Sequence, residues 1–315
     1  MPAAAAATLD SRDLALLRLL DSDARASLAE LGCAVRLSKS AVAQRITRLE
    51  KEGFIDGYYA VIDSSRLGYL SFRVYLKFYK TSPRRESEII DFLLGDERVW
   101  WLGRIEGEWD AGFVVWVRDL YDFRNFWLKF LSKFRPGIGR HVISPYVKLA
   151  HFSGGREAGV VGEGPKIAID ETDRKVLRAV SANARDGVTA LAAKTGLRPA
   201  VVKYRLKQLV RKGVVQRFRA KINSAKLGLS LYKVEFYLDD WSKLAALRAF
   251  AGGFPSLVYV DETIGGGDFE AEFNLASQQE LRALVAQFKK RFSFSIREIT
   301  YVVYSEVLKY SYFPS

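Results

Sequence analysis

The chain of 315 residues has little of the residue types that build disulfides and zinc sites. Cys33 is its only cysteine, which excludes an intrachain disulfide and a cysteine cluster for zinc. Because Cys33 stands in an apolar segment, we expect it to be a small core residue. Only His141 and His151 represent histidine, and neither belongs to a pair with metal-ligand spacing. The sequence therefore predicts no metal and no cofactor.

Long apolar runs are also missing, since no stretch of about 20 residues would span a bilayer. Residues Met1 to Ala7 carry no Lys or Arg and so lack the charged start of a secretory signal. Acidic residues are outnumbered, with 36 Asp and Glu against 49 Lys and Arg, which gives a net charge of +13. Such a charge favours a polyanionic partner. We expect a cytoplasmic, nucleoid-associated protein without a membrane partner.

What the sequence does contain is an internal repeat. Position n matches position n+160 without a gap over more than one hundred residues. The matches include Ala24-Arg25 with Ala184-Arg185, Gly53 with Gly213, Leu67-Gly68 with Leu227-Gly228, and Gly107, Trp109, Asp110 and Phe113 with Gly267, Phe269, Glu270 and Phe273. Between the copies, segment 153–165 has five glycines in thirteen residues, which predicts a flexible, exposed linker.

Each copy begins with the pattern of three short helices. In the first copy, Asp10 caps one helix, a second covers about 28–34, and Ser38 caps a third that Gly53 ends. Helix, short helix, turn and polar-faced helix is typical of a helix-turn-helix, whose last helix enters the major groove of DNA. The residues expected to contact double-stranded DNA are Ser38, Lys39, Ser40, Gln44, Thr47 and Arg48 in the first copy, and Lys203, Tyr204, Lys207 and Arg211 in the second.

The two copies differ in charge at this place. Residues 198–221 hold nine basic residues and no acidic one, whereas the matching stretch 38–61 holds four basic and three acidic residues. A solvated helix face normally mixes both signs, so the second copy has the pattern of a phosphate-binding stripe.

The remainder of each copy alternates strand, helix, strand, strand, helix, strand, which predicts a ferredoxin-like βαββαβ sandwich domain and an α+β fold overall. The expected domains are a first winged helix-turn-helix over 1–57, a first α/β sandwich over 58–152, a Gly-rich linker over 153–165, a second winged helix-turn-helix over 166–217 and a second sandwich over 218–315.

These motifs resemble the Lrp/AsnC family of transcriptional regulators over nearly the whole chain, twice. The resemblance is carried by residues 37–42, 45–46, 48–50, 52–55, 57–58 and 67–68, and by the hairpin 107–110. It implies a winged-helix DNA reader joined to a sandwich domain that pairs sheet to sheet. It also implies a small effector, often an amino acid, bound between sandwich domains near the hairpins, at Gly107, Trp109, Asp110, Gly267, Phe269 and Glu270.

The sequence departs from the family pattern in three ways. The family norm is a single copy. The second hairpin has Glu270 where the first has Asp110, with extra glycines before it. The second recognition helix begins Arg198-Pro199-Ala200 and so lacks the hydroxyl cap of Ser38. At the first hairpin, Asp110 would receive an ammonium group, or else it merely closes the turn.

Two other function classes stay open. One is an enzyme like the sirohaem decarboxylases, which are also built from fused halves of this kind and act on tetrapyrroles. Such chemistry needs His or Arg groups in a large pocket. The sequence contains only two histidines, His141 and His151. The other is a scaffold or effector sensor whose helix-turn-helix units no longer bind DNA. The motifs favour a regulator that is not an enzyme.

Strand 113–117 is apolar on both faces, and such a surface does not stay in water. We therefore expect the two sandwich domains to pair within one chain as a pseudo-dimer, with further homo-oligomers open. The polar face of Glu270, Glu272 and Asn274 then needs cationic partners if it is buried, and Arg104 is the candidate.

Overall fold

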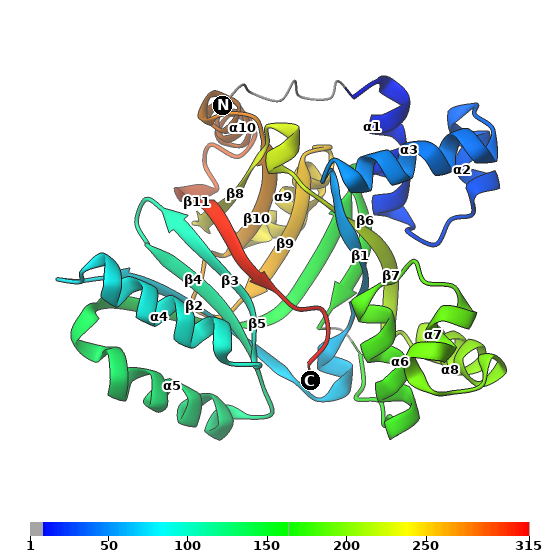
Figure 1. Ribbon diagram of the computed structural model, residues 1–315. Helices are drawn as coiled ribbons and strands as arrows, with labels where there is room; N and C mark the ends of the chain where they lie inside the picture. The colour runs from blue at the N-terminus through cyan, green and yellow to red at the C-terminus, as the bar shows by residue number, and fades with distance from the viewer. Residues whose placement is uncertain (1–8, 163, 315) are drawn as a thin grey trace. The chain divides into compact units, whose positions relative to one another are not determined.

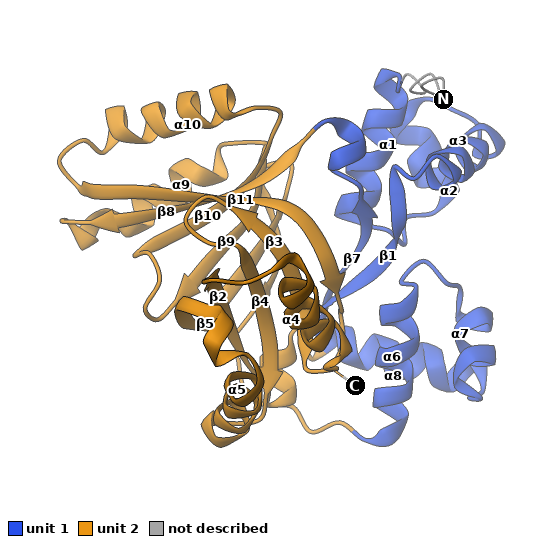
Figure 2. Ribbon diagram, turned by 60° about the vertical axis from the view of Figure 1, so that its left-hand side comes forward, with its two compact units in different colours: residues 1–61, 170–211, 215–228 blue, residues 62–169, 212–214, 229–315 orange. Residues whose placement is uncertain are grey.

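A computed structural model describes residues 9–162 and 164–314. These residues form two compact units (Figure 2). Of the described residues, unit 1 holds 9–61, 170–211 and 215–228, and unit 2 holds 62–162, 164–169, 212–214 and 229–314. Each unit therefore combines segments of the same type from both copies of the repeat.

In unit 1, the first copy folds as three helices and a strand: α1 (Ser11–Ser22), α2 (Leu28–Val35), α3 (Lys39–Lys51) and β1 (Ile55–Ile62) (Figure 1). Asp10 begins α1 with a capping box, in which its carboxylate accepts from the N–H of Asp13 and the carboxylate of Asp13 accepts from the N–H of Asp10. Cys33 is exposed on α2, so its expected burial is wrong. The inward positions of this helix belong to Leu31 and Val35.

The second copy repeats this order: α6 (Glu171–Ala182), α7 (Val188–Thr195), α8 (Pro199–Arg211) and β7 (Val215–Ile222). Asp170 and Asp173 form the same capping box at the start of α6. Pro199 is the first residue of α8, where its missing N–H removes no helical hydrogen bond. Helix-turn-helix units are thus confirmed in both copies.

The two copies are joined inside unit 1 by reciprocal hydrogen bonds. Strands β1 and β7 form a two-stranded sheet. The N–H of Ala24 donates to the carbonyl of Phe218 at 2.8 Å, and the counterpart Ala184 donates to the carbonyl of Tyr58 at 3.0 Å. Each strand therefore packs on the helical part of the other copy, and the two helix-turn-helix units are held as one body.

Unit 2 contains the two sandwich domains. The first is built from β2 (Leu70–Phe78), α4 (Pro83–Gly95), β3 (Val99–Glu106), β4 (Ala111–Val117), α5 (Leu120–Phe134) and β5 (Ile138–Ser153). The second is built from β8 (Ser230–Leu238), α9 (Leu244–Gly252), β9 (Leu257–Thr263), β10 (Phe269–Leu275), α10 (Gln278–Arg291) and β11 (Ile296–Tyr310). Short 3₁₀ turns η1 to η4 lie at Ser64–Leu67, Arg135–Gly137, Ala225–Leu227 and Trp241–Lys243.

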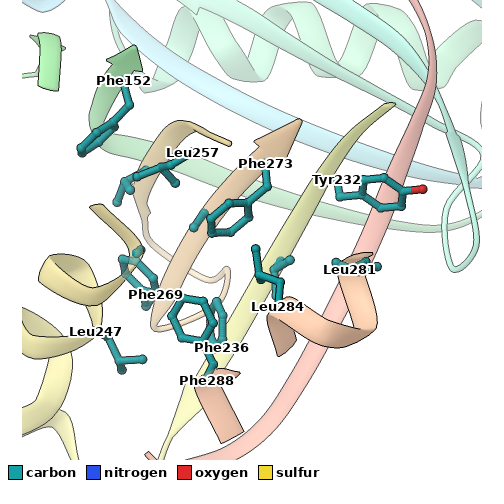
Figure 3. Packing of buried hydrophobic residues seen from close by; sticks show 14 of the residues in the cluster. Phe152, Tyr232, Phe236, Leu247, Leu257, Phe269, Phe273, Leu281, Leu284 and Phe288 are labelled. Carbon is teal, nitrogen blue, oxygen red and sulfur yellow. The ribbon is translucent and has the colours of Figure 1, made fainter. Parts of the chain in front are cut away.

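The strand orders β5-β2-β4-β3 and β11-β8-β10-β9 are the same, and they confirm the ferredoxin-like arrangement twice. Every second residue of the strands faces the helices and forms an apolar core. In the second domain, Phe236, Phe269 and Phe273 meet Leu284 and Phe288 of α10 (Figure 3).

The two sheets join edge to edge into one ring of eight antiparallel strands. Strand β3 pairs with β11, β5 pairs with β9, and β2 pairs with β5, which closes the ring. Closure of a sheet satisfies the edges of its strands, and eight strands enclose a space that side chains fill. The sandwich domains therefore pair within one chain, as expected.

The interior of this barrel is apolar on one side. Trp100, Trp101, Ile105, Trp116 and Val302 belong to one buried cluster there. The other side carries charge: two cations and four carboxylates, namely Arg73, Lys233, Glu235, Asp261, Glu270 and Glu272.

Glu270 is the centre of this ion network. Its carboxylate binds Arg73 through two hydrogen bonds of 2.5 and 2.9 Å, and the ammonium group of Lys233 lies 2.8 Å away. Burial alone would raise the pKa of Glu270, but the charges of Arg73 and Lys233 override it and lower this pKa. The polar face of β10 is thus buried, and its partners are Arg73 and Lys233. Arg104 was the wrong candidate, because it pairs with Glu306 at 3.4 Å on a more exposed part of the barrel.

Segment 153–165 is not a flexible linker throughout. Residues Arg156–Val161 form strand β6, which pairs with β5 as a hairpin. Gly154 and Gly155, with φ of 56° and 78°, form its two-residue turn, which only residues that tolerate positive φ make readily.

In the structure, the residues of the two hairpins do not correspond as the repeat in the sequence aligns them. Asp110 accepts a hydrogen bond from the N–H of Phe78 at 2.7 Å, and Asp268 accepts one from the N–H of Leu238 at 2.7 Å. Phe78 and Leu238 occupy equivalent places in β2 and β8. The counterpart of Asp110 is therefore Asp268, and Glu270 does not replace an aspartate.

Removing this carboxylate is expected to loosen each hairpin. Asp110→Asn and Asp268→Asn should each lower the free energy of unfolding by roughly 1–2 kcal/mol, because a charge-assisted bond to a backbone N–H is weakened. Urea denaturation measures the loss. The exposed Asp239→Asn is the control, with a change within about 0.5 kcal/mol. An effect at only one hairpin would contradict the equivalence.

The second prediction concerns pH. Burial raises the pKa of Glu272 from 4.5 to about 7, with Lys233 opposing this shift and Asp261 reinforcing it. Because the folded protein holds this proton more tightly, the stabilisation is complete below about pH 4.5 and is lost as the pH rises through about 7.

Glu272→Gln should remove this contribution and flatten the fall of stability between these two pH values. Urea midpoints at several pH values measure it, with the exposed Glu306→Gln as the control that keeps the wild-type profile. Identical slopes for Glu272→Gln and wild type would count against it.

Candidate DNA-binding surface and effector hairpins

Helix α3 is positioned by an apolar stripe on its inner side. Val42, Ile46 and Leu49 are buried, and the hydroxyl of Ser38 accepts from the N–H of Ala41 at 3.2 Å to begin the helix. The outer side presents five of the predicted DNA-binding residues, all at least partly exposed: Ser38, Lys39, Ser40, Gln44 and Thr47. These side chains are small or uncharged except Lys39, and groups of this kind bind base edges as well as phosphates.

Arg48, the sixth residue predicted to bind DNA, forms an ion pair within unit 1. Its guanidinium lies 2.5 Å from the carboxylate of Asp13, which is fully buried, and Arg45 binds the same carboxylate at 2.7 Å. An unpaired carboxylate at this depth would be costly, so the two arginines stabilise α3 against α1. Arg48 thus has a structural contact, and the binding of its partly exposed side chain to DNA stays a prediction.

Helix α8 has the same inner stripe, with Val202, Leu206 and Leu209 buried. All four residues predicted to bind DNA are exposed on its outer side: Lys203, Tyr204, Lys207 and Arg211. The side chain of Tyr204 is unusually open for a large aromatic residue, with the residue 61% exposed, which leaves its ring face and hydroxyl available.

Two of the nine basic residues of segment 198–221 are not available for phosphate. Arg205 binds Asp170 at 2.7 Å, and Arg219 is buried and binds Asp21 at 2.7 Å. Seven remain at the surface: Arg198, Lys203, Lys207, Arg211, Lys212, Arg217 and Lys221. Of these, Lys212 belongs to unit 2, and the other six belong to unit 1.

The first hairpin holds its predicted effector residues in structural contacts. Asp110 binds the N–H of Phe78 and, at 2.8 Å, the ammonium group of Lys77. Trp109 is buried, and the guanidinium of Arg140 stacks 4.6 Å from its ring centroid. Gly107 supplies the positive φ of 112° that the turn needs. The carboxylate of Asp110 thus joins the hairpin to the end of β2, and its binding of an effector ammonium group stays a prediction.

The second hairpin is likewise engaged. Glu270 accepts from the N–H of Gly267 and from the hydroxyl of Thr263, each at 2.9 Å, besides binding Arg73 and Lys233. Phe269 points to the opposite face and packs in the core under the helices. Gly267 and Glu270 therefore lie together, whereas Phe269 lies on the other face of β10, away from them.

The histidines are packed against aromatic rings. The ring centroid of His141 lies 4.9 Å from that of Trp127, and His151, 4% exposed, lies 5.0 Å from Tyr259. Among residues 9–162 and 164–314, no group of three or more His, Cys, Asp or Glu is placed to hold a metal ion. Within the same residues, no helix is both long and apolar enough to cross a membrane.

Comparison with known proteins gives the same assignment of the helical units. A family profile for winged helix-turn-helix DNA-binding domains matches residues 9–56 and again 169–216. These segments correspond to the helices of unit 1 and the beginnings of β1 and β7.

Relatives with regulator names are similar over one copy. The HTH-type transcriptional regulator LrpA of Pyrococcus horikoshii is 32% identical over 117 residues, which are 37% of this chain and 82% of that protein. The Bkd operon transcriptional regulator of Pseudomonas aeruginosa is 32% identical over 121 residues, or 38% of this chain and 79% of that protein.

A solved structure is similar over both copies. The crystal structure of the siroheme decarboxylase NirDL with an iron-uroporphyrin III analogue aligns with 96% of this chain and 94% of that chain, at a TM-score of 0.65 and 12% identity. At this identity the likeness shows a shared duplicated fold. Since the regulators are matched over about four fifths of their length, and the DNA-binding unit occurs twice, this chain belongs to the Lrp/AsnC family of transcriptional regulators, with two copies of the family's unit in one polypeptide.

Proposed function

We propose that this protein is a transcriptional regulator that binds double-stranded DNA with both helix-turn-helix units of one chain at the same time. The observation that carries the proposal is the pairing of β1 with β7 in unit 1, which fixes α3 and α8 in one body. Arg25 donates to the carbonyl of Ala184 at 2.8 Å, and Arg185 donates to that of Ala24 at 2.5 Å, so the reciprocity extends to side chains. Paired readers of this kind bind two half-sites at a fixed spacing.

The two readers are chemically unlike. Helix α3 presents Ser40, Gln44 and Thr47, whereas α8 presents Lys203, Lys207 and Arg211. Hydroxyl and amide groups can bind base edges, and a run of cationic side chains neutralises phosphates. We infer an operator with two unlike half-sites, one read mainly through bases and the other held mainly through its backbone. The protein then binds in one orientation.

The tetrapyrrole enzyme is the second candidate, and the likeness to NirDL is the observation in its favour. Its chemistry would need His or Arg groups free to act in the barrel. His151 is buried against Tyr259, and Arg73 is bonded to Glu270. These contacts support the regulator over the enzyme. An amino-acid effector belongs to the proposal as a ligand whose site is not yet assigned, since Asp110 and Glu270 are both engaged.

Selection of bound sequences from a random duplex pool at physiological salt tests the proposal. We expect enrichment of one site composed of two different half-sites. Duplex binding no stronger than that of an unrelated basic protein would refute the proposed regulator. A new absorbance on mixing with an iron tetrapyrrole would then favour the enzyme.

The third prediction concerns α8 and salt. Replacing both Lys203 and Lys207 with Ala should reduce the slope of log affinity against log salt by roughly 0.9 for each phosphate that the variant no longer neutralises. The matched control removes the same charge from exposed positions on α10 in unit 2, with Lys289→Ala and Lys290→Ala, and should leave the slope unchanged. Equal slopes in both double variants would rule out a phosphate role for α8.

The fourth prediction concerns base readout by α3. Thr47→Val keeps the shape of the side chain and removes the hydroxyl, so the preferred bases should change in one half-site while the other stays the same. Repeating the selection with the variant measures this. Lys203→Ala is the comparison, which should weaken all sequences alike. If Thr47→Val also weakens all sequences alike, Thr47 contacts the DNA backbone.

A further inference from the structure

The charges inside the barrel are divided unequally between the two sandwich domains. Of the six charged residues in the network, only Arg73 comes from the first domain. The second contributes Lys233 and all four carboxylates, so the network carries two more negative than positive charges when every group is ionised. Arg73 reaches across the domain boundary into this group, with Glu270 at 2.5 Å and Glu235 and Asp261 both at 3.7 Å.

Strand registers show what stands at the equivalent places of the first domain. The counterpart of Lys233 is Arg73, so this cation is common to both. The counterparts of Glu235, Asp261, Glu270 and Glu272 are Tyr75, Gly103, Gly112 and Val114. None of these four is acidic. A carboxylate would not fit at Gly112, because a Cβ there would lie 2.8 Å from the ring of Tyr75.

Pairing of like domains would therefore bury charge without compensation. Two first domains would face each other with two copies of Arg73 and no carboxylate in this layer. Two second domains would bring eight carboxylates together around two lysines. Buried unpaired charges and like charges in contact are both unfavourable, whereas the unlike pair supplies a cation to the carboxylates.

Unit 1 contains a second buried ion pair that joins the first copy to the second. Arg219 of β7 binds Asp21 of α1 through two hydrogen bonds, of 3.0 and 2.7 Å, and its side chain is 4% exposed. The counterparts of Asp21 and Arg219 in the other copies are Ser181 and Tyr59. This ion pair also forms only between a first and a second copy.

We propose that these buried ions select unlike partners: a first copy pairs with a second copy of this chain, and neither pairs with its own kind. The inner face of the first sandwich domain, with Arg73, accepts a partner that carries four inward carboxylates around a lysine. In the intact chain, the partner is the tethered second copy.

The test uses full-length protein with a protease site inserted between residues 162 and 164, folded first and then cut. The cut protein is unfolded in urea, refolded by dilution and weighed by native mass spectrometry. Three pairings have different masses: first with first, second with second, and first with second. We expect the unlike pair almost alone, with like pairs below about one twentieth of the total.

The variant Arg73→Met with Arg219→Tyr removes one buried cation from each of the two interfaces. Like pairs should rise at least about fivefold in it. The matched control, Arg104→Met with Arg217→Tyr, removes two arginines nearer the surface instead and should keep the wild-type distribution, because exposed ion pairs contribute little. A random distribution of pairs in the wild type, or equal distributions in variant and control, would overturn the proposal.

A second measurement uses intact chains and so does not depend on reassociation. A double-mutant cycle of Arg73→Met and Glu270→Gln should give a coupling of at least about tenfold in the unfolding equilibrium constant. The cycle of Arg104→Met and Glu306→Gln, which also joins the two copies, should give about twofold or less. Coupling at Arg73 no larger than at Arg104 would refute the selection by buried charge.

Discussion

The bond between Arg73 and Glu270 is the interaction on which unit 2 depends. A barrel of two sheets buries one face of every strand, and here part of that face is ionic. Each of the four carboxylates lies within 3.7 Å of Arg73 or Lys233, because an unpaired buried charge is costly. The hairpin before β10 is shaped by this requirement. A Cβ at Gly266 would overlap a carboxylate oxygen of Glu270, so only glycine lets the turn cover that group.

Unit 1 depends on a comparable buried charge. Asp13 is sealed beneath α3, and Arg45 and Arg48 turn away from the outer face of the helix to bind it. Their engagement leaves α3 with a nearly uncharged reading surface. In the second copy, Arg205 performs this role through Asp170 and Asp173, while Gln208 stands where the first copy has Arg48.

The helices and the order of the strands were predictable from the sequence, because capping residues and apolar periodicity are local signals. Asp10, Ser38 and the stripe of Val42, Ile46 and Leu49 act within one helix and mean the same in any fold. Strand β6 also had a local signal, the pair Gly154-Gly155 between apolar alternations, but glycine count alone favoured a linker.

Which residue of the second hairpin corresponds to Asp110 was not predictable. The sequence alignment of the two copies pairs Asp110 with Glu270, whereas the hydrogen bonds show that Asp268 is its counterpart. The partner of Glu270, Arg73, was not predictable for a different reason. It lies 197 positions away in the sequence, and the direction of its side chain depends on how the two sheets close into a barrel.

The reciprocal bonds between the copies have a consequence for how such a chain changes over generations. In an assembly of identical subunits, one substitution alters both symmetry-related places at once, so a cation and its partner cannot be placed on opposite sides independently. Fusion of the copies removes that coupling. Arg73 is the one member of the ion network that the first copy supplies, and Arg198 stands before α8 where α3 has the hydroxyl cap of Ser38. The two halves are therefore free to specialise while their shared frame, bonded strand to strand, stays the same.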